Sequence, residues 1–178
     1  MKTLRNAVPL VALAALAAAG CFLVSGQFVV SYALPTPLHV TAAATLTGVD
    51  VNLNTIGEYS DHKNDLKRVD DLALIGDFKN NAGSAAAVET WIVPAGTLGL
   101  TAAQLTAQGS KLWGPLSVGA GATEKVDWNR SAGLFVGRQS LIDEIKGDGH
   151  FSLYVIASGA FDLTLSNGAV IAVIGAAK

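Results

Sequence analysis

The side chains best suited to chemistry are the acids and amides that gather between residues 50 and 71. Asp50, Asn52 and Asn54 alternate along a strand-like segment, which places all three on one face. Carboxylate and amide oxygens are the ligands that Ca²⁺ prefers in secreted modules. Thr55 follows where a calcium loop of the D-x-[DN]-x-[DN]-G type requires glycine. We therefore expect a solvated polar face without a metal or cofactor; the alternative is a Ca²⁺ site at Asp50, Asn52 and Asn54.

The three histidines, His39, His62 and His150, are scattered along the chain. None has the H-x-H, H-x₃-H or H-E-x-x-H spacing of a metal site, so we expect isolated surface histidines. The chain also lacks a G-x-S-x-G elbow, an S-x-x-K motif and a P-loop. We predict no catalytic residue and no enzyme. An extracellular hydrolase would need a histidine, a carboxylate and a serine to converge in the fold.

The chemistry of Cys21, the only cysteine, is decided by the residues before it. Lys2 and Arg5 precede an apolar run over 7–19 and the small residues Ala18-Ala19-Gly20, as in a secretory signal peptide. Ala-Ala-Gly-Cys at 18–21 resembles the lipobox of bacterial lipoproteins. That resemblance implies diacylation of Cys21, which becomes the mature N-terminus and anchors the protein to a membrane.

Two other fates of the N-terminal region stay open. No charged side chain occurs between Arg5 and Asp50, and residues 7–30 are long enough to span about 30 Å of hydrocarbon as a retained helix. Cleavage after Ser31-Tyr32-Ala33 would instead release a soluble domain. All three interpretations place the body of the protein outside the cytoplasm, and we expect it in the cell envelope of a bacterium.

The composition favours an exported β protein. Charged residues make up 15% of the chain, against about 25% in ordinary domains, and 51% of residues are apolar. The formal net charge is −2, or −4 without Lys2 and Arg5, which excludes nucleic acid as a partner. We divide the chain into a signal peptide over 1–20, a lipid-anchored segment or first strand over 21–38, and one domain over 39–178.

Short alternating segments separated by turn residues predict the secondary structure. We expect strands over 27–32, 39–53, 72–79, 85–94, 112–118, 123–128, 151–157, 160–165 and 169–175. Short helices are expected over 61–68, from a capping box at Thr101 and Gln104, and over 140–146. The turn residues 80–84 predict a hairpin between the strands at 72–79 and 85–94. The pattern indicates an all-β, antiparallel β-sandwich with two or three short helical insertions.

The three tryptophans, Trp91, Trp113 and Trp128, fall within or beside predicted strands. We expect them to pack in the core or between the sheets; the alternative is an aromatic platform for a sugar or a peptide.

Two segments resemble known bacterial proteins. The turn at 80–84, followed by Leu112-Trp113-Gly114-Pro115-Leu116, resembles the immunoglobulin-like or fibronectin-like modules of bacterial surface proteins. Residues 48–94 resemble uncharacterised bacterial lipoproteins. These resemblances imply an immunoglobulin-like sandwich and lend no catalytic residue.

We therefore expect a non-enzymatic, membrane-anchored envelope lipoprotein that binds or scaffolds another surface component. Loops and sheet edges would be its working surfaces. One alternative is a carrier that holds a small hydrophobic ligand between its sheets. Another is an assembly subunit whose apolar segment 22–34 adds as a strand to a neighbour's sheet.

Overall fold

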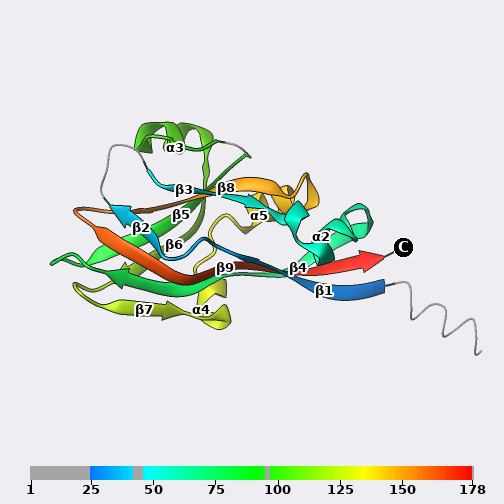
Figure 1. Cartoon of the computed structure of the whole chain (residues 1–178), viewed down its shortest axis with the longest axis horizontal. Helices are drawn as coiled ribbons and strands as arrows, with labels where there is room; N and C mark the ends of the chain where they lie inside the picture. Colours follow the sequence, from blue (N-terminus) through cyan, green and yellow to red (C-terminus); the bar gives the residue numbers. More distant parts are fainter. Residues whose placement is uncertain (1–24, 42–45, 95–96, 178) are drawn as a thin grey trace, which may run out of the picture.

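The computed structural model describes residues 25–41, 46–94 and 97–177. Cys21 and the predicted signal peptide lie outside these residues. Two antiparallel sheets pack face to face (Figure 1), which confirms the predicted sandwich. One sheet contains β1 (Ser25–Ala33), β2 (Leu38–Thr41), β9 (Asp162–Ala177), β4 (Leu66–Asn80) and β7 (Thr123–Val126). The other contains β3 (Gly48–Asn52), β8 (His150–Ala157), β5 (Ala86–Pro94) and β6 (Ser110–Val118).

The strand pairing is nested. β2 pairs with β9, β3 with β8, β4 with β7 and β5 with β6. Pairing of β4 with β9 and of β5 with β8 completes the two sheets. This is the strand order of a jelly roll, in which one long antiparallel hairpin is rolled into a sandwich. This strand order differs from the immunoglobulin-like order that the resemblance implies.

Large side chains fill the space between the sheets. Trp113 of β6 is fully buried and stacks on Phe78 of β4, with ring centroids 5.6 Å apart. Leu72, Phe151 and Ile174 are buried in the same cluster. Aromatic and branched residues, rather than alanine and glycine, therefore dominate the interior.

A second, smaller apolar cluster lies on the outer face of the β3–β8–β5–β6 sheet. It comprises Leu46, Val93, Leu100, Leu105 and Tyr154. Leu105 belongs to α3 (Ala102–Gln108), which begins at the predicted capping box: Thr101 accepts from the Gln104 backbone, and the Gln104 side chain accepts from the Thr101 backbone. The local prediction of this helix is confirmed.

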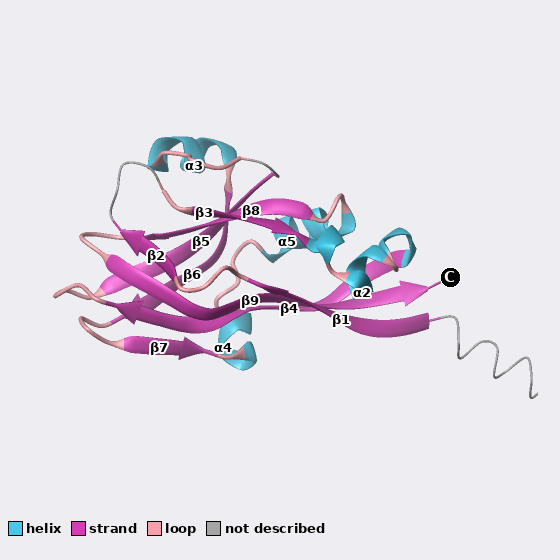
Figure 2. Cartoon of the chain, in the orientation of Figure 1, coloured by secondary structure: helices cyan, strands magenta, loops and turns pink. Residues whose placement is uncertain are grey.

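The other helices are α2 (Gly57–Ser60), α4 (Trp128–Ala132) and α5 (Arg138–Lys146), with 3-10 turns over Leu53–Thr55 and Lys63–Asp65. These helices pack along the sheets and at one end of the sandwich, where α5 contacts strands of both sheets (Figure 2). The helix predicted over 140–146 is confirmed as α5, whose Leu141 and Ile145 are buried. Among the described helices, none has the length and apolarity needed to cross a membrane.

The helix predicted over 61–68 is wrong. Leu66 begins β4, and Val69 packs against the core from within that strand. Two apolar residues three apart fit a helix face, but this pair enters a fifteen-residue strand that bonds to β9. The strand predicted up to Trp128 also ends early, because Asp127 caps the first turn of α4 by accepting from the Arg130 backbone.

The predicted hairpin around residues 80–84 is also wrong, because β4 and β5 belong to different sheets. Asn80 is fully buried, and its side-chain amide donates to the carbonyls of Ser84, Val118 and Gly119. Its carboxamide oxygen accepts from the Ala82 backbone at 3.0 Å. The turn residues therefore hold a crossover between the two sheets.

The last two predicted strands are one. Asn167 and Gly168 lie inside β9, where the pairing with β4 shifts register between Ile75 and Asp77. Asn167 has a φ of 54°, and its amide donates to Asp77 at 2.8 Å. A residue that tolerates positive φ serves a β-bulge here, where the sequence suggested a turn.

Candidate functional site

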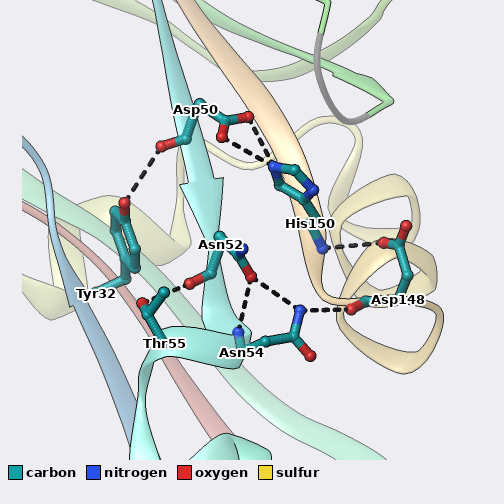
Figure 3. Close-up of polar contacts among 7 residues, drawn as sticks. All are labelled: Tyr32, Asp50, Asn52, Asn54, Thr55, Asp148 and His150. Carbon is teal, nitrogen blue, oxygen red and sulfur yellow. Dashed lines mark hydrogen bonds and ion pairs between the residues drawn. The ribbon is translucent and has the colours of Figure 1, made fainter.

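The most concentrated polar network joins the ends of β3 and β8 (Figure 3). In antiparallel pairing Asn52 lies opposite His150, which brings the His150 ring beside Asp50. His150 Nε2 lies 2.8 Å and 3.0 Å from the two carboxylate oxygens of Asp50, and both side chains are half-buried. The hydroxyl of Tyr32, on β1, donates to the Asp50 carbonyl at 3.2 Å. The Asp50–His150 pair therefore lies where β1 of one sheet approaches β3 of the other.

The two amides of the predicted polar face lie below this pair. The Asn52 carboxamide oxygen accepts from the Asn54 backbone at 3.0 Å and from the Asn54 side chain at 2.8 Å. Asn54 has left the strand, because β3 ends at Asn52 and a 3-10 turn begins at Leu53. Asp50, Asn52 and Asn54 are neighbours in the structure, but their oxygens do not converge on one point.

Lys63 and Asp148 complete the network. The Lys63 ammonium donates to the Asn54 carboxamide oxygen and to the Asp148 carbonyl, each at 2.8 Å. Asn54 also donates to that carbonyl at 2.9 Å, and the Asp148 carboxylate accepts from the His150 backbone at 2.9 Å. A cation of the chain itself thus lies against one of the oxygens proposed for Ca²⁺, the Asn54 carboxamide oxygen. Among the described residues, no three His, Cys, Asp or Glu side chains are grouped so as to hold a metal.

Two residues near Asp148 have raised pKa values, chiefly because they are buried and secondarily because of the Asp148 charge. Burial raises the pKa of Tyr59 to about 12, helped by the nearby charge of Asp148. Burial also raises the pKa of Glu144, with smaller contributions from Asp148 and Asp143. The neutral Tyr59 hydroxyl donates to the Ile145 carbonyl at 2.7 Å and so fixes α2 against α5.

The other two histidines lie apart from this network. His39 of β2 contacts Asp162 of β9 at 2.5 Å on the surface. The hydrogen bond from His39, and then one from Asn81, lowers the pKa of Asp162. His62 packs its ring 4.9 Å from that of Phe28. Two of the three histidines therefore pair with carboxylates, and in neither pair is a serine hydroxyl within hydrogen-bonding distance among the described residues.

The three tryptophans differ in how deeply they are buried. Trp113 is buried as predicted. Trp91 and Trp128 are only half-buried, and their indole nitrogens donate to Glu89 at 3.4 Å and to Asp71 at 3.0 Å. The prediction of core packing is confirmed for Trp113. Trp91 packs against the smaller apolar cluster on the outer face of its sheet, and Trp128 belongs to neither cluster.

A polar groove of about 240 Å³ lies between the ends of β5 and β6, the end of α3 and the exposed side of α5. Its polar lining comes from Gln108, Ser110, Ser140, Asp143 and Glu144. An acyl chain needs an apolar cavity, and this groove is open and carries two carboxylates. It does not suit such a ligand.

Sequence reasoning singled out Asp50, Asn52 and Asn54 but missed Tyr32, Lys63 and Asp148. The contacts that recruit them join residues far apart in the chain, such as Lys63 with Asp148 and Tyr32 with Asp50. A strand register is needed to find such pairs, and the sequence pattern does not supply one.

Comparison with known proteins identifies no family. No protein-family model and no curated protein matches the sequence. Among solved structures, a chain from "Crystal structure of the T13 IBDV viral particle reveals a missing link in icosahedral viruses evolution" matches with a TM-score of 0.30 and 9% identity. The match covers 84% of this chain and 31% of that one.

Proposed function

We propose that the protein is a non-enzymatic module held at a bacterial membrane by a lipidated Cys21, where it binds or scaffolds another component of the envelope. The observation that carries this proposal is the closure of the polar network. The Asp50 carboxylate pairs with the His150 ring. The Asn52 side chain accepts a hydrogen bond from the Asn54 side chain, which in turn accepts one from Lys63. Side chains bonded to one another in this way form a structural joint, which leaves the faces and edges of the sandwich as working surfaces.

The position of β1 supports an anchor close to the domain. β1 begins at Ser25, four residues after Cys21. Four extended residues span at most about 14 Å. A diacylated Cys21 would therefore hold the sandwich close to the membrane surface, and two acyl chains give stable anchoring. The resemblance of the N-terminal segment to a lipobox supports the same proposal.

The competing functions have less support. A carrier needs free apolar space between its sheets, and large side chains such as Trp113 and Phe151 occupy that region. A hydrolase needs a nucleophile beside its histidine, and the described contacts of His39 and His150 are with carboxylates. An assembly subunit that donates residues 22–34 needs a free strand, whereas β1 is bonded to β9 from Ser25 to Ala33.

The test is membrane fractionation of the full chain beside the variant Cys21→Ala. We expect the wild-type chain to stay with membranes in high salt and to leave them in detergent, and we expect the variant to leave membranes without detergent. Retention of a correctly folded Cys21→Ala chain in high-salt membranes would contradict lipid anchoring at this residue.

A further inference from the structure

Residues 127–131, at the start of α4, match an acceptor sequence for an N-linked glycan. Asn129 is followed by Arg130 and then by Ser131, and Asn-x-Ser with any middle residue except proline is a sequence at which oligosaccharides are attached to asparagine. Asp127 stands two residues before Asn129, where bacterial acceptor sequences carry an acid. No other asparagine of the chain is followed by serine or threonine at the second position.

The neighbours of Asn129 are engaged in the fold, whereas Asn129 itself faces solvent. The Asp127 carboxylate accepts from the Arg130 backbone at 2.8 Å and so caps α4. The Arg130 guanidinium pairs with Glu124 of β7 at 2.7 Å. Asn129 is exposed, and its side chain makes no hydrogen bond among the described residues. Its carboxamide is therefore accessible for a covalent attachment.

Ser131 has the opposite environment. It is fully buried, and its hydroxyl accepts from the Leu74 backbone at 2.7 Å and from the Trp113 indole at 3.3 Å. An enzyme that selects Asn-x-Ser must contact this hydroxyl, because the hydroxyl distinguishes the acceptor sequence from other asparagines. The folded chain hides it, so the acceptor sequence can be recognised only before α4 packs against β4.

We propose that Asn129 is an N-glycosylation site, modified while the chain is exported and before the sandwich folds. The Asn129 amide nitrogen attacks the anomeric carbon of an oligosaccharide carried on a polyprenyl diphosphate. A C–N bond forms, the C–O bond to the diphosphate breaks, the nitrogen loses one proton, and the polyprenyl diphosphate leaves with the electron pair. The inference rests on the export in the proposed function but does not require lipidation of Cys21.

The position of Asn129 indicates what the sugar would do in the folded protein. α4 packs against β4 and β7 (Figure 1). β7 is the last strand of its sheet, and an edge strand can pair with another chain unless something blocks it. A bulky, hydrated oligosaccharide on Asn129 would stand beside β7 and hinder such pairing. The modification thus protects one side of the scaffold and leaves partner binding to the other sides.

The first test is mass spectrometry of the protein isolated from the organism that makes it. A protease that cuts before aspartate releases residues 127–142 as one peptide, in which Asn129 is the only asparagine. We expect this peptide to carry an oligosaccharide, and enzymatic release of the sugar should convert Asn129 to aspartate. The matched control is Asn64, which is also exposed but has Leu66 where the acceptor sequence needs a hydroxyl. Unmodified Asn129, or equal modification of Asn64, would overturn the proposal.

Two variants test the acceptor sequence without disturbing the buried Ser131. Asn129→Gln removes the acceptor at an exposed position, so it should lose the oligosaccharide. Asp127→Asn keeps a side chain that caps a helix well but removes the acid, so it should show a lower glycan occupancy. A glycan on the 127–142 peptide of Asn129→Gln would overturn the assignment, and unchanged occupancy in Asp127→Asn would contradict recognition of the acid.

The second test concerns the order of modification and folding. The full chain is purified in its folded, unmodified form and incubated with a bacterial oligosaccharyltransferase and a polyprenyl-diphosphate-linked oligosaccharide. We expect no modification, whereas the same chain exported through a membrane that holds this enzyme should be modified at Asn129. Equal modification of the folded chain would contradict the proposed order, and no modification during export would overturn the site itself. The 127–142 peptide reports Asn129 and the N-terminal peptide reports Cys21, so failure of the glycan and failure of the anchor can be told apart.

Discussion

Replacing Lys63 by methionine separates the two interpretations of the polar network, a structural joint or a calcium site. The variant keeps most of the side-chain length but loses an ammonium that makes two hydrogen bonds of 2.8 Å. A hydrogen bond to a charged group contributes roughly 1.5 to 3 kcal/mol when buried, and an exposed ion pair roughly 0.2 to 1 kcal/mol. Lys63 is half-buried, so we expect a loss of about 1 kcal/mol.

For a domain of this size, 1 kcal/mol corresponds to a Tm shift of about 2 to 4 °C. The assay is thermal unfolding of the full chain, with and without millimolar Ca²⁺, beside the exposed control Lys67→Met. We expect a lower Tm for Lys63→Met, no change for the control, and no effect of Ca²⁺ on the wild type. A ligand at 100 times its Kd adds about 2.7 kcal/mol, which would raise the Tm by several degrees. Such a rise in the wild type would refute the structural interpretation.

Three further predictions concern the core, a turn and a surface pair. Trp113→Ala should cost about 3 to 5 kcal/mol in denaturant unfolding, since it empties the stacked centre of the core; a loss below about 1 kcal/mol would contradict that packing. Gly149→Ala should lower the Tm, because φ is 72° and a Cβ would lie 2.2 Å from the Tyr59 hydroxyl oxygen; an unchanged Tm would show that this contact relaxes freely. Asp162 has a lowered pKa, so its pairing with His39 stabilises the fold above the ordinary value of 3.8, and the stabilisation disappears as pH falls through the lowered pKa. Asp162→Asn should therefore be less stable than wild type near pH 6 and equal to it at the acid end of the titration; a constant difference across this range would contradict the assignment.

The parts of the fold that depend on neighbouring residues could be predicted from the sequence. The capping box at Thr101 and Gln104 and the spacing of Leu141 and Ile145 identify α3 and α5, because a cap and a helix face are contacts within one or two turns. The alternation of short apolar segments similarly identifies the sandwich class.

Strand partners could not be predicted in this way. The turn residues after Asn80 favour a chain reversal, but they do not say whether the next strand stays in the same sheet. The buried Asn80 amide donates to the carbonyls of Val118 and Gly119, and these hydrogen bonds stabilise a crossover to the other sheet. Asn167 shows the same limit, because a tolerance of positive φ fits both a turn and a bulge.

The candidate site likewise could be predicted only in part. Asp50, Asn52 and Asn54 stand out by spacing alone. His150 becomes a neighbour of Asp50 only when β3 and β8 are aligned, and Lys63 reaches Asn54 from the 3-10 turn over Lys63–Asp65.

The most direct test of the proposed anchored module is the intact mass of the mature protein extracted from its native membrane. Lipid anchoring predicts a chain that starts at Cys21 and carries an adduct of diacylglycerol size, which Cys21→Ala abolishes. An unmodified chain that starts at Met1 would contradict it in favour of a retained helix over residues 7–30. A start at Leu34 would contradict it too, and would remove β1 from the mature protein.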